Sequence, residues 1–561
     1  MQNTYSQTIE PNGNHSVNVA RYLKTMARVQ PYRRAVVYPA GRDANGRAAY
    51  SHLTFRQLDR ESDCFARGLE QAGIGRGIRT ILMVRPSLEF FALTFALFKV
   101  GAVPVMVDPG MGVGRMLSCL KESRANALIG IPPAHVLRTL RPSFFKSVKT
   151  VVTVGKRWFW RGHTLADIRA LPWKPFTIAD TQKEETAAIL FTTGSTGPAK
   201  GVIYSHGLFD AQVRYIRAQF GISPDDIDLP TFPLFALFDP ALGMTAIIPE
   251  MDPTRPAKVD PRKIVEAVVN HGVTNMFASP ALLNRVGRYG KSHGIKLPSL
   301  KRVISAGAPA TPANIAQFST MLGEEAQIHT GYGATEAMPV SSFGSNDILT
   351  ETAPLSEQGY GMCVGRPIGG VELCIIKISD DVIEEWTDDL LVENGEIGEI
   401  TVAGEIVTRS YFRRPKNDRE SKIVDQSRLW HRMGDVGWLD SKGRIWFCGR
   451  KSHRVITAGK TLFTIPCEAI FNNHPAVFRS ALVGLGHAPR QKPVVCIELE
   501  PDYRNTDRRE LTGELIEMAR GSVITEGLDT ILYHPGFPVD IRHNSKIFRE
   551  KLADWAARKV E

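Results

Sequence analysis

Residues 189–201 read ILFTTGSTGPAKG, and this stretch decides both the local fold and the chemistry. An apolar run from Ala187 to Phe191 predicts a buried strand that leads into a loop of small and hydroxyl-bearing residues. Glycines let backbone N–H groups approach an anion, while hydroxyls and a lysine add donors for phosphate oxygens. It is not a G-x-x-x-x-G-K-[ST] loop, because Ala199 stands where that motif needs its second glycine. We therefore expect a phosphate-binding loop rather than a flexible linker.

A second element is the stretch 329–337, HTGYGATEA. Its start is strand-like, and we expect a Gly-Tyr-Gly turn to deliver Thr335 and Glu336 at the carboxyl end of a strand, where α/β sheets bind ligands. Glu336 is a candidate Mg²⁺ ligand, and Thr335 is a candidate donor to a phosphate oxygen. The ring of Tyr332 offers a flat face for a purine.

Three more segments carry candidate binding groups. The small residues of 305–310, SAGAPA, leave room for a planar ring against the backbone. In 431–440, HRMGDVGWLD, Asp435 can accept hydrogen bonds from both hydroxyls of a ribose. Near the C-terminus, 542–552 reads RHNSKIFREKL and holds Lys546 behind a turn-like HNS. Each segment alone is also compatible with a surface turn or a surface charge.

In order and spacing these segments resemble the acyl-adenylate-forming superfamily, which includes acyl-CoA synthetases, luciferases and the adenylation domains of peptide synthetases. The resemblance implies ATP and Mg²⁺ as cofactors, with Glu336 and Thr192 holding the metal. It also implies that Lys546 bridges the substrate carboxylate and the α-phosphate during adenylation. The nucleotide-binding residues that it implies are Thr192, Thr193, Gly194, Ser195, Thr196, Gly197, Lys200, Gly307, Ala308, Pro309, Gly331, Tyr332, Gly333, Thr335, Asp435 and Arg450.

The length of 561 residues exceeds what one core accommodates. Helical spacing over 53–73, and a buried helix followed by a strand over 88–109, begin an alternation that predicts α/β layers around mainly parallel sheets. A turn-rich stretch at 435–452, with a hairpin signal over 440–443, precedes a segment long enough for a small α+β domain.

The resemblance implies the same division, a large N-terminal domain of layered α/β subdomains and a smaller, mobile α+β C-terminal domain. We therefore expect a flexible tail over 1–16 and an N-terminal adenylation domain over 17–440. A hinge region over 441–452 and a mobile C-terminal domain over 453–561 complete the predicted organisation.

Composition limits the partners and the compartment. The net charge of +11 favours anionic partners such as nucleotides, but the basic clusters 413–422 and 504–509 lack the pattern of a nucleic-acid module. We interpret these clusters as solvated faces and expect no nucleic-acid partner. Seven scattered cysteines without metal-site spacing indicate free thiols in a reducing compartment. With neither a transmembrane stretch nor a signal-peptide pattern, the chain is expected to be cytoplasmic.

Two departures from the superfamily pattern concern the second half-reaction. Ala236 stands where many acyl-CoA synthetases carry a histidine, and Ser452 stands where many relatives carry Asp or Lys at the hinge. Overall, the chain resembles most the synthetases that form β-lactones in bacterial long-chain olefin biosynthesis. This resemblance implies a 2-alkyl-3-hydroxy long-chain fatty acid whose 3-hydroxyl attacks the activated carbonyl and expels AMP. His206 and His453 are candidates for the base that takes the hydroxyl proton.

Two other functions stay open at this point. One is a long-chain fatty acyl-CoA or acyl-AMP ligase, and the other is a non-catalytic nucleotide-binding scaffold, against which the presence of Glu336 and Lys546 argues. A separate feature is the stretch 155–162, GKRWFWRG, which combines basic and aromatic residues. Such a combination suits a peripheral membrane contact or a pathway-enzyme contact through 156–161, although a packed surface loop has the same composition.

Overall fold

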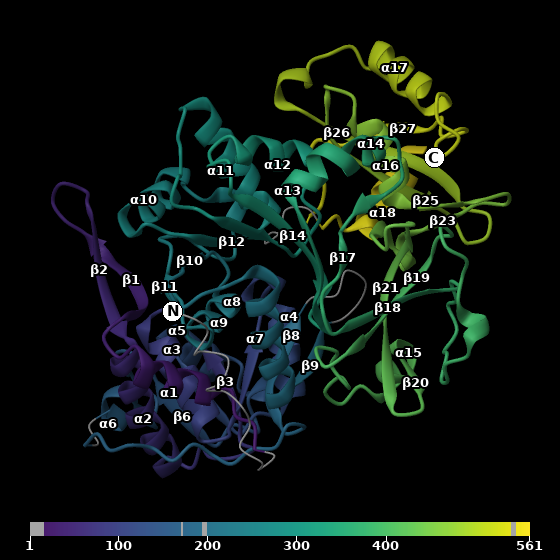
Figure 1. Ribbon diagram of the computed structural model, residues 1–561. Coiled ribbons are helices and arrows are strands. Elements are labelled where there is room, and N and C mark those ends of the chain that lie inside the picture. The colour runs from purple at the N-terminus through teal and green to yellow at the C-terminus, as the bar shows by residue number, and fades with distance from the viewer. Residues whose placement is uncertain (1–15, 170–171, 193–198, 540–545, 561) are drawn as a thin grey trace. The chain divides into compact units, whose positions relative to one another are not determined.

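The computed structural model describes residues 16–169, 172–192, 199–539 and 546–560 (Figure 1). The chain folds into two compact units. The first comprises Met1–Glu250, Ala267–Asn275 and Thr408–Pro415, and the second comprises Met251–Glu266, Met276–Val407 and Lys416–Glu561. Of the tail predicted over 1–16, all but Ser16 lies outside the described residues.

The first unit contains a seven-stranded sheet in the order β7-β6-β5-β3-β4-β8-β9. Its neighbours pair in parallel except β8 and β9, so the prediction of a mainly parallel α/β sheet is confirmed here. The strands are β3 (Arg79–Met83), β4 (Val103–Val107), β5 (Ala127–Gly130), β6 (Thr150–Thr153), β7 (His163–Thr164), β8 (Thr186–Thr192) and β9 (Lys200–Ser205).

Two helices that contribute to the core of the first unit lie within the stretches predicted to be helical. Helix α2 (Phe55–Gln71) begins at a capping box formed by Thr54 and Gln57 and ends before Gly73, whose φ of +79° favours glycine. Helix α3 (Leu88–Lys99) is buried along almost its whole length, which explains why its sequence is apolar on every face. The other helices are α1 (Ala20–Val29), α4 (Val113–Ser123), α5 (Pro132–Leu140), α6 (Leu165–Arg169) and α7 (His206–Phe220).

A buried lysine ties these two helices together. The side chain of Lys99 is 0% exposed, and its ammonium group donates to the carboxylates of Asp59 and Asp63, at 2.6 Å in each case. Burial of an unpaired ammonium is very costly, so the two carboxylates of α2 are what make this position possible.

The first unit also contains part of a second sheet. Strand β1 (Arg34–Arg42) pairs antiparallel with β2 (Ala48–Thr54) and parallel with β11 (Thr245–Ile247), which in turn pairs parallel with β10 (Ile227–Pro230). The short helices α8 (Pro233–Ala236) and α9 (Phe238–Leu242) connect β10 to β11.

In the second unit, strands follow one another in the order β17-β15-β14-β13-β12. Strands β13 and β14 are parallel, whereas β14 and β15 form an antiparallel hairpin. The bounds are β12 (Asn275–Ala278), β13 (Arg302–Ser305), β14 (Gln327–Ala334), β15 (Ala337–Gly344) and β17 (Arg366–Pro367). Accompanying helices are α11 (Pro280–Ser292), α12 (Pro312–Ser319), α13 (Ser345–Asp347) and α14 (Ala353–Glu357), while α10 (Pro261–His271) is divided between the two units after Glu266.

A wholly antiparallel sheet over residues 362–450 departs from the parallel pattern. Its order is β16-β22-β21-β19-β18, with β20 paired to β21. The bounds are β16 (Met362–Cys363), β18 (Val371–Ile376), β19 (Gly398–Gly404), β20 (Lys422–Asp425), β21 (Arg428–Leu439) and β22 (Ile445–Arg450), with helix α15 (Pro415–Ser421) before β20. The hairpin predicted at 440–443 is confirmed, because Gly443 N–H donates to the Asp440 carbonyl between β21 and β22.

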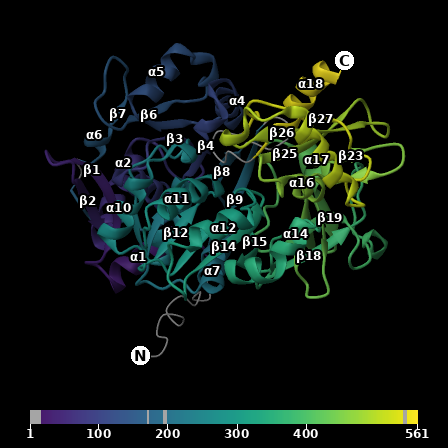
Figure 2. The same ribbon diagram turned by 90° about the horizontal axis from the view of Figure 1, so that it is seen from above.

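The segment after residue 453 has a hydrophobic core of its own. A three-stranded sheet, β25-β26-β27, lies in this segment together with three helices (Figures 1 and 2). The first two helices pack on a core whose buried members include Phe471, Val495 and Leu515, and the third packs on a separate core that includes Val494 and Cys496. The elements are β23 (Val455–Ile456), β24 (Thr461–Leu462), α16 (Thr464–Asn472), β25 (Val477–Leu485), β26 (Lys492–Leu499), α17 (Arg508–Arg520), β27 (Ile531–Tyr533) and α18 (Arg549–Val560). This arrangement is α+β, as predicted.

Strand β22 lies within the hinge region predicted over 441–452. Residues 445–450 are strand, and Trp446 within it is almost completely buried. The connection from this sheet to β23 is therefore the short stretch Lys451–Arg454, most of which is a 3₁₀ turn over Lys451–His453. All seven cysteines are free, and within the described ranges no helix has the length and apolarity needed to cross a membrane.

Candidate active site

The hairpin of β14 and β15 presents Thr335 and Glu336. Ala334 pairs with Ala337, so Thr335 and Glu336 form the turn itself, and both are half-buried. The predicted Gly-Tyr-Gly turn is wrong in this detail, because Gly331 and Tyr332 continue β14 and pair with Ser342 and Ser341. The pleat of that strand, rather than a turn, directs the Tyr332 side chain.

A buried carboxylate, Asp435, is the centre of the site in the second unit. The Tyr332 hydroxyl donates to Asp435 Oδ2 at 2.8 Å, and Arg450 Nη1 lies 3.1 Å from Asp435 Oδ1. Register explains the second contact, since Asp435 of β21 is paired directly with Arg450 of β22. Asp435 Oδ1 accepts no hydrogen bond from the described residues. A buried oxygen in this state is an acceptor ready for a ligand hydroxyl.

The charges around Asp435 place two more predicted residues, Lys546 and Glu336, near it. Burial raises the pKa of the Asp435 carboxyl, and Arg450, Tyr332 and Lys546 lower it, whereas Glu336 raises it further. Lys546 and Glu336 are therefore within electrostatic reach of Asp435. Burial, with the Asp435 charge next, raises the pKa of the Tyr332 hydroxyl, so this phenol stays protonated and keeps donating.

The SAGAPA segment lies beside the same strand. Ser305 at the end of β13 pairs in parallel with Thr330 of β14, and Gly307 follows with a φ of +94°. A Cβ atom at Gly331 would lie 3.6 Å from Cβ of Ala306, so the backbones of the two segments approach closely. The structure thus places Gly307, Ala308 and Pro309 in the turn that follows β13, next to β14.

One charged residue of this site was missed from the sequence. Lys422, the first residue of β20, is only 6% exposed, although it ends the cluster 413–422 that was interpreted as a solvated face. Burial lowers the pKa of Lys422 to about 8, while the charges of Glu336 and Asp418 act to raise it. The strand-like run KIVD that begins at Lys422 was the available signal, because a half-buried strand can take its first residue inside.

The remaining predicted residues belong to the first unit. Thr192 ends β8, and Thr193, Gly194, Ser195, Thr196 and Gly197 lie outside the described residues. Lys200 begins β9, and its ammonium group lies 4.9 Å from the ring centre of Tyr411. The structure therefore confirms the strand that precedes the phosphate loop, while the roles of the loop residues remain predictions.

The two histidines considered as bases are both buried. The Val19 N–H donates to His206 Nδ1 at 3.5 Å, and burial lowers the pKa of His206 to about 4. Burial also lowers the pKa of His453 to about 3, with the charges of Arg549 and Arg450 acting in the same direction. Both imidazoles are neutral at pH 7 and so are free to take up a proton. Their lowered pKa values make them weak bases for this purpose. Their role as bases remains a prediction.

Residues 158–160 divide into an exposed and a buried part. Trp158 and Phe159 are 56% and 70% exposed, whereas Trp160 is 6% exposed. The Trp160 indole N–H donates to Thr153 Oγ1 at 2.9 Å, and its ring stacks on His135. Trp160 is thus part of the core, and only its two aromatic neighbours are accessible for docking.

Glu336 offers one carboxylate of the kind that binds Mg²⁺. Mg²⁺ is usually held by one or two carboxylates together with substrate phosphates and water. Glu336 is a half-buried carboxylate in a turn, and within the described ranges no group of three or more His, Cys, Asp or Glu forms a metal site. Glu336 would hold the ion, which would neutralise phosphate charge.

Comparisons with known proteins found similar enzymes. The family model described as AMP-binding enzyme matches residues 23–412. An olefin β-lactone synthetase from Xanthomonas campestris is 47% identical over 548 residues, covering 96% of this chain and 98% of the relative. One from Stenotrophomonas maltophilia is 47% identical over 557 residues, covering 98% of this chain and 99% of the relative.

The fold also matches solved structures. An O-succinylbenzoate coenzyme A synthetase from Bacillus subtilis, in complex with ATP and a magnesium ion, superimposes with a TM-score of 0.74. The two chains are 20% identical, and the match covers 95% of this chain and 98% of that one. At this identity the likeness concerns the fold, which is that of the acyl-adenylate-forming enzymes.

Proposed function

Because the chain belongs to the AMP-binding enzyme family, we propose that it activates a 2-alkyl-3-hydroxy long-chain fatty acid as its acyl-adenylate and closes it to a β-lactone. The observation that carries the nucleotide site is the buried carboxylate of Asp435, held between Tyr332 and Arg450 with Oδ1 open to a hydroxyl donor. The identity of 47% over nearly the whole chain to two olefin β-lactone synthetases supports the second half-reaction.

In the first half-reaction, the protein's residues bind and orient ATP and neutralise charge. Asp435 accepts the ribose hydroxyls, and Arg450 beside it adds a positive charge. A carboxylate oxygen of the substrate attacks the α-phosphorus, and pyrophosphate leaves. Lys546 stabilises the charge on the α-phosphate as the bond forms, a role in which a fixed donor contributes most. Mg²⁺ held by Glu336 supplies further neutralisation of the phosphates.

In the second half-reaction, the nucleophile is already part of the substrate. The 3-hydroxyl oxygen attacks the carbonyl carbon of the adenylate, the bond from that carbon to the AMP oxygen breaks, and the hydroxyl proton is released. The products are a four-membered β-lactone and AMP. The nucleophile and the carbonyl belong to one molecule, so no thiol is required and proximity offsets part of the ring strain.

We propose the domain limits 17–440, 441–452 and 453–561 for this enzyme. The separate core of the C-terminal segment supports its treatment as a domain. Substrates must enter and products must leave a site that Lys546 helps to close, which requires this domain to open. The connection Lys451–Arg454 is the stretch where such motion would begin.

Product analysis tests the proposed function. The enzyme, ATP and a 2-alkyl-3-hydroxy acid should give AMP, pyrophosphate and a product lighter than the acid by one water, whether or not coenzyme A is present. The matched acid without the 3-hydroxyl should still release pyrophosphate but should give no lactone. A coenzyme A thioester as the main product would instead identify an acyl-CoA ligase, and no pyrophosphate from either acid would exclude adenylation.

A further inference from the structure

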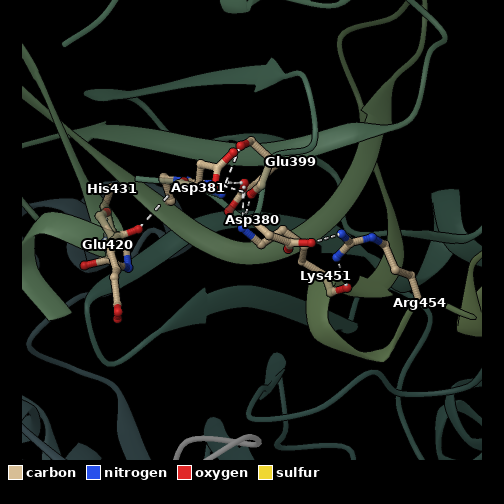
Figure 3. Close-up of polar contacts among 10 residues, drawn as sticks. Asp380, Asp381, Glu399, Glu420, His431, Lys451 and Arg454 are labelled. Atoms are coloured by element: carbon tan, nitrogen blue, oxygen red, sulfur yellow. Dashed lines mark hydrogen bonds and ion pairs between the residues drawn. The ribbon is translucent and has the colours of Figure 1, made fainter. Parts of the chain in front are cut away.

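In the second unit, the buried carboxylate of Glu399 on β19 forms ion pairs with two basic side chains (Figure 3). Its Oε2 atom accepts from Arg432 Nη2 at 2.7 Å and from Lys451 Nζ at 3.1 Å. Glu399 is 1% exposed, so this is a buried ion cluster. Arg432 lies on β21, next to β19 in the same sheet, whereas Lys451 lies on the connection to the C-terminal domain.

The same two cations hold the backbone of residues 379–381. Arg432 donates to the carbonyls of Ser379 at 2.6 Å and Asp381 at 2.7 Å. Lys451 Nζ donates to the Ser379 carbonyl at 2.7 Å. Arg454 also binds this segment through an ion pair, in which its Nη2 lies 2.5 Å from Asp380 Oδ2 (Figure 3). The side chains at both ends of the connection, Lys451 and Arg454, thus bind residues 379–381.

Lys451 is not needed to neutralise Glu399. Arg432 already pairs with this carboxylate and is itself satisfied by backbone carbonyls. Burial lowers the pKa of Lys451, so its placement carries a desolvation cost that Glu399 offsets. Lys451 lies on the connection between the two proposed domains. Its buried contacts therefore act mainly to fix the position of this connection.

The fastened connection contacts the helix that follows Lys546. His453 Nε2 lies 3.6 Å from Glu550 Oε1 on α18, and the adjacent Arg549 forms an ion pair with Glu468 of α16 at 2.5 Å. Lys546 lies three residues before Arg549, where this helix begins, and its neighbour Ile547 forms a β-bridge with Val539. Residues 379–381, the connection and the start of α18 are thus in contact one after another, the last step being the 3.6 Å approach of His453 to Glu550.

We infer that Lys451 and Arg454 are positioning residues that fix the connection to residues 379–381 and thereby hold Lys546 within reach of Asp435. This inference rests on the proposed role of Lys546 in adenylation. We call the contacts of Lys451 and Arg454 with residues 379–381 the clamp. The Asp380 side chain is exposed to solvent, so the Arg454–Asp380 ion pair is the part of the clamp that can break when the domain opens.

Hydrogen exchange on the full-length enzyme without ligands tests the clamp directly. The double variant K451M/R454M should exchange amides of 546–560 faster by roughly fivefold or more, because local opening becomes easier. It should adenylate about tenfold more slowly with KM for ATP within about twofold, because the charge donor is misplaced while the nucleotide site is intact. Exchange and adenylation at the parent rates would overturn the inference.

Matched controls and a charge reversal separate positioning from general stability. K442M and R428M remove cations from exposed ion pairs with Glu351 and Glu372 in the same unit, and they should change neither measurement. R454E should reproduce the defect of the double variant, and D380R/R454E should restore both exchange and adenylation. A D380R/R454E enzyme that melts like the parent but stays as defective as R454E would contradict the clamp. K546A, assayed in parallel, tests the proposed function separately, since exchange reports on the clamp even if Lys546 proves dispensable.

Discussion

The hydroxyl of Tyr332 donates a hydrogen bond of 2.8 Å to Oδ2 of Asp435, although the two residues are 103 positions apart in the sequence. This bond joins strand β14, which leads into the turn at Glu336, to strand β21, which pairs with the strand of Arg450. It also leaves Asp435 Oδ1 without a hydrogen-bond donor among the described residues. The predictions below begin from this carboxylate.

Asp435→Asn should weaken ATP binding by about 2 kcal/mol, or roughly 30-fold, because hydrogen bonds to a charged acceptor contribute on this scale. Tyr332→Phe should cost less, about 1 kcal/mol, because the carboxylate remains. Calorimetry with ATP and with 2′,3′-dideoxy-ATP measures the effect. The two nucleotides should differ for the parent and bind alike to Asp435→Asn; an unchanged difference would mean that Asp435 does not hold the ribose.

Lys546→Ala should slow pyrophosphate release by about 100-fold or more and leave ATP affinity close to that of the parent, since the lost charge acts mainly in the transition state. Pyrophosphate exchange and nucleotide titration measure the two quantities. Lys559→Ala, an exposed lysine near the end of α18, serves as the control. Parent-like exchange by Lys546→Ala would remove this lysine from the mechanism.

Lys99→Met should lower the free energy of unfolding by about 3–5 kcal/mol, because the buried carboxylate of Asp63 and the half-buried carboxylate of Asp59 lose their partner. Lys24→Met is the matched control. Lys24 is 3.9 Å from Asp63 but 41% exposed, so its loss should cost less than about 1 kcal/mol. Equal losses of unfolding free energy in denaturant titrations of the two variants would contradict this expectation, because the buried Lys99 should contribute more than the exposed Lys24.

The exposed aromatic pair should carry any docking to a membrane or a partner enzyme. Trp158→Ser combined with Phe159→Ser should reduce sedimentation with lipid vesicles and spare activity on short, soluble acids, because apolar exposed area is lost without disturbing the core. Trp160→Ser should instead lower thermal stability, because its ring and N–H are satisfied inside. If the double variant sediments with vesicles as the parent does, this segment is a surface loop with no part in membrane docking.

Acid should destabilise the fold partly through His206. Burial lowers the pKa of His206 to about 4, so between pH 6.5 and pH 4 the unfolded chain binds a proton that the folded imidazole does not. Stability therefore falls as the pH falls through this window, by up to about 3 kcal/mol from this one group. Denaturant titrations from pH 7 to pH 4.5 should show a shallower decline for His206→Gln. The exposed His487→Gln should keep the decline of the parent, and a parent-like decline in both variants would exclude His206 as the cause.

Much of the fold was predictable because its signals are local. The capping residue Thr54 and the glycine after α2 bound that helix, and alternating helix and strand patterns predicted the parallel sheet of the first unit. The antiparallel sheet over 362–450 was predicted only at its 440–443 hairpin, since the pairing of β19 with β18 and β21 joins segments that carry no shared sequence signal.

What the sequence determined by itself is the family and the order of its short segments, in which we predict a phosphate-binding loop, a metal-ligand turn, a ribose acceptor and a closing lysine. What only the tertiary structure decided is the environment of individual charged and aromatic side chains. Lys422 and Trp160 are buried, and Lys451 reaches Glu399, because partners distant in the sequence surround them. Burial and ion pairing depend on those partners, whereas turns, caps and strand ends depend on immediate neighbours, and this difference in range separates the two kinds of knowledge.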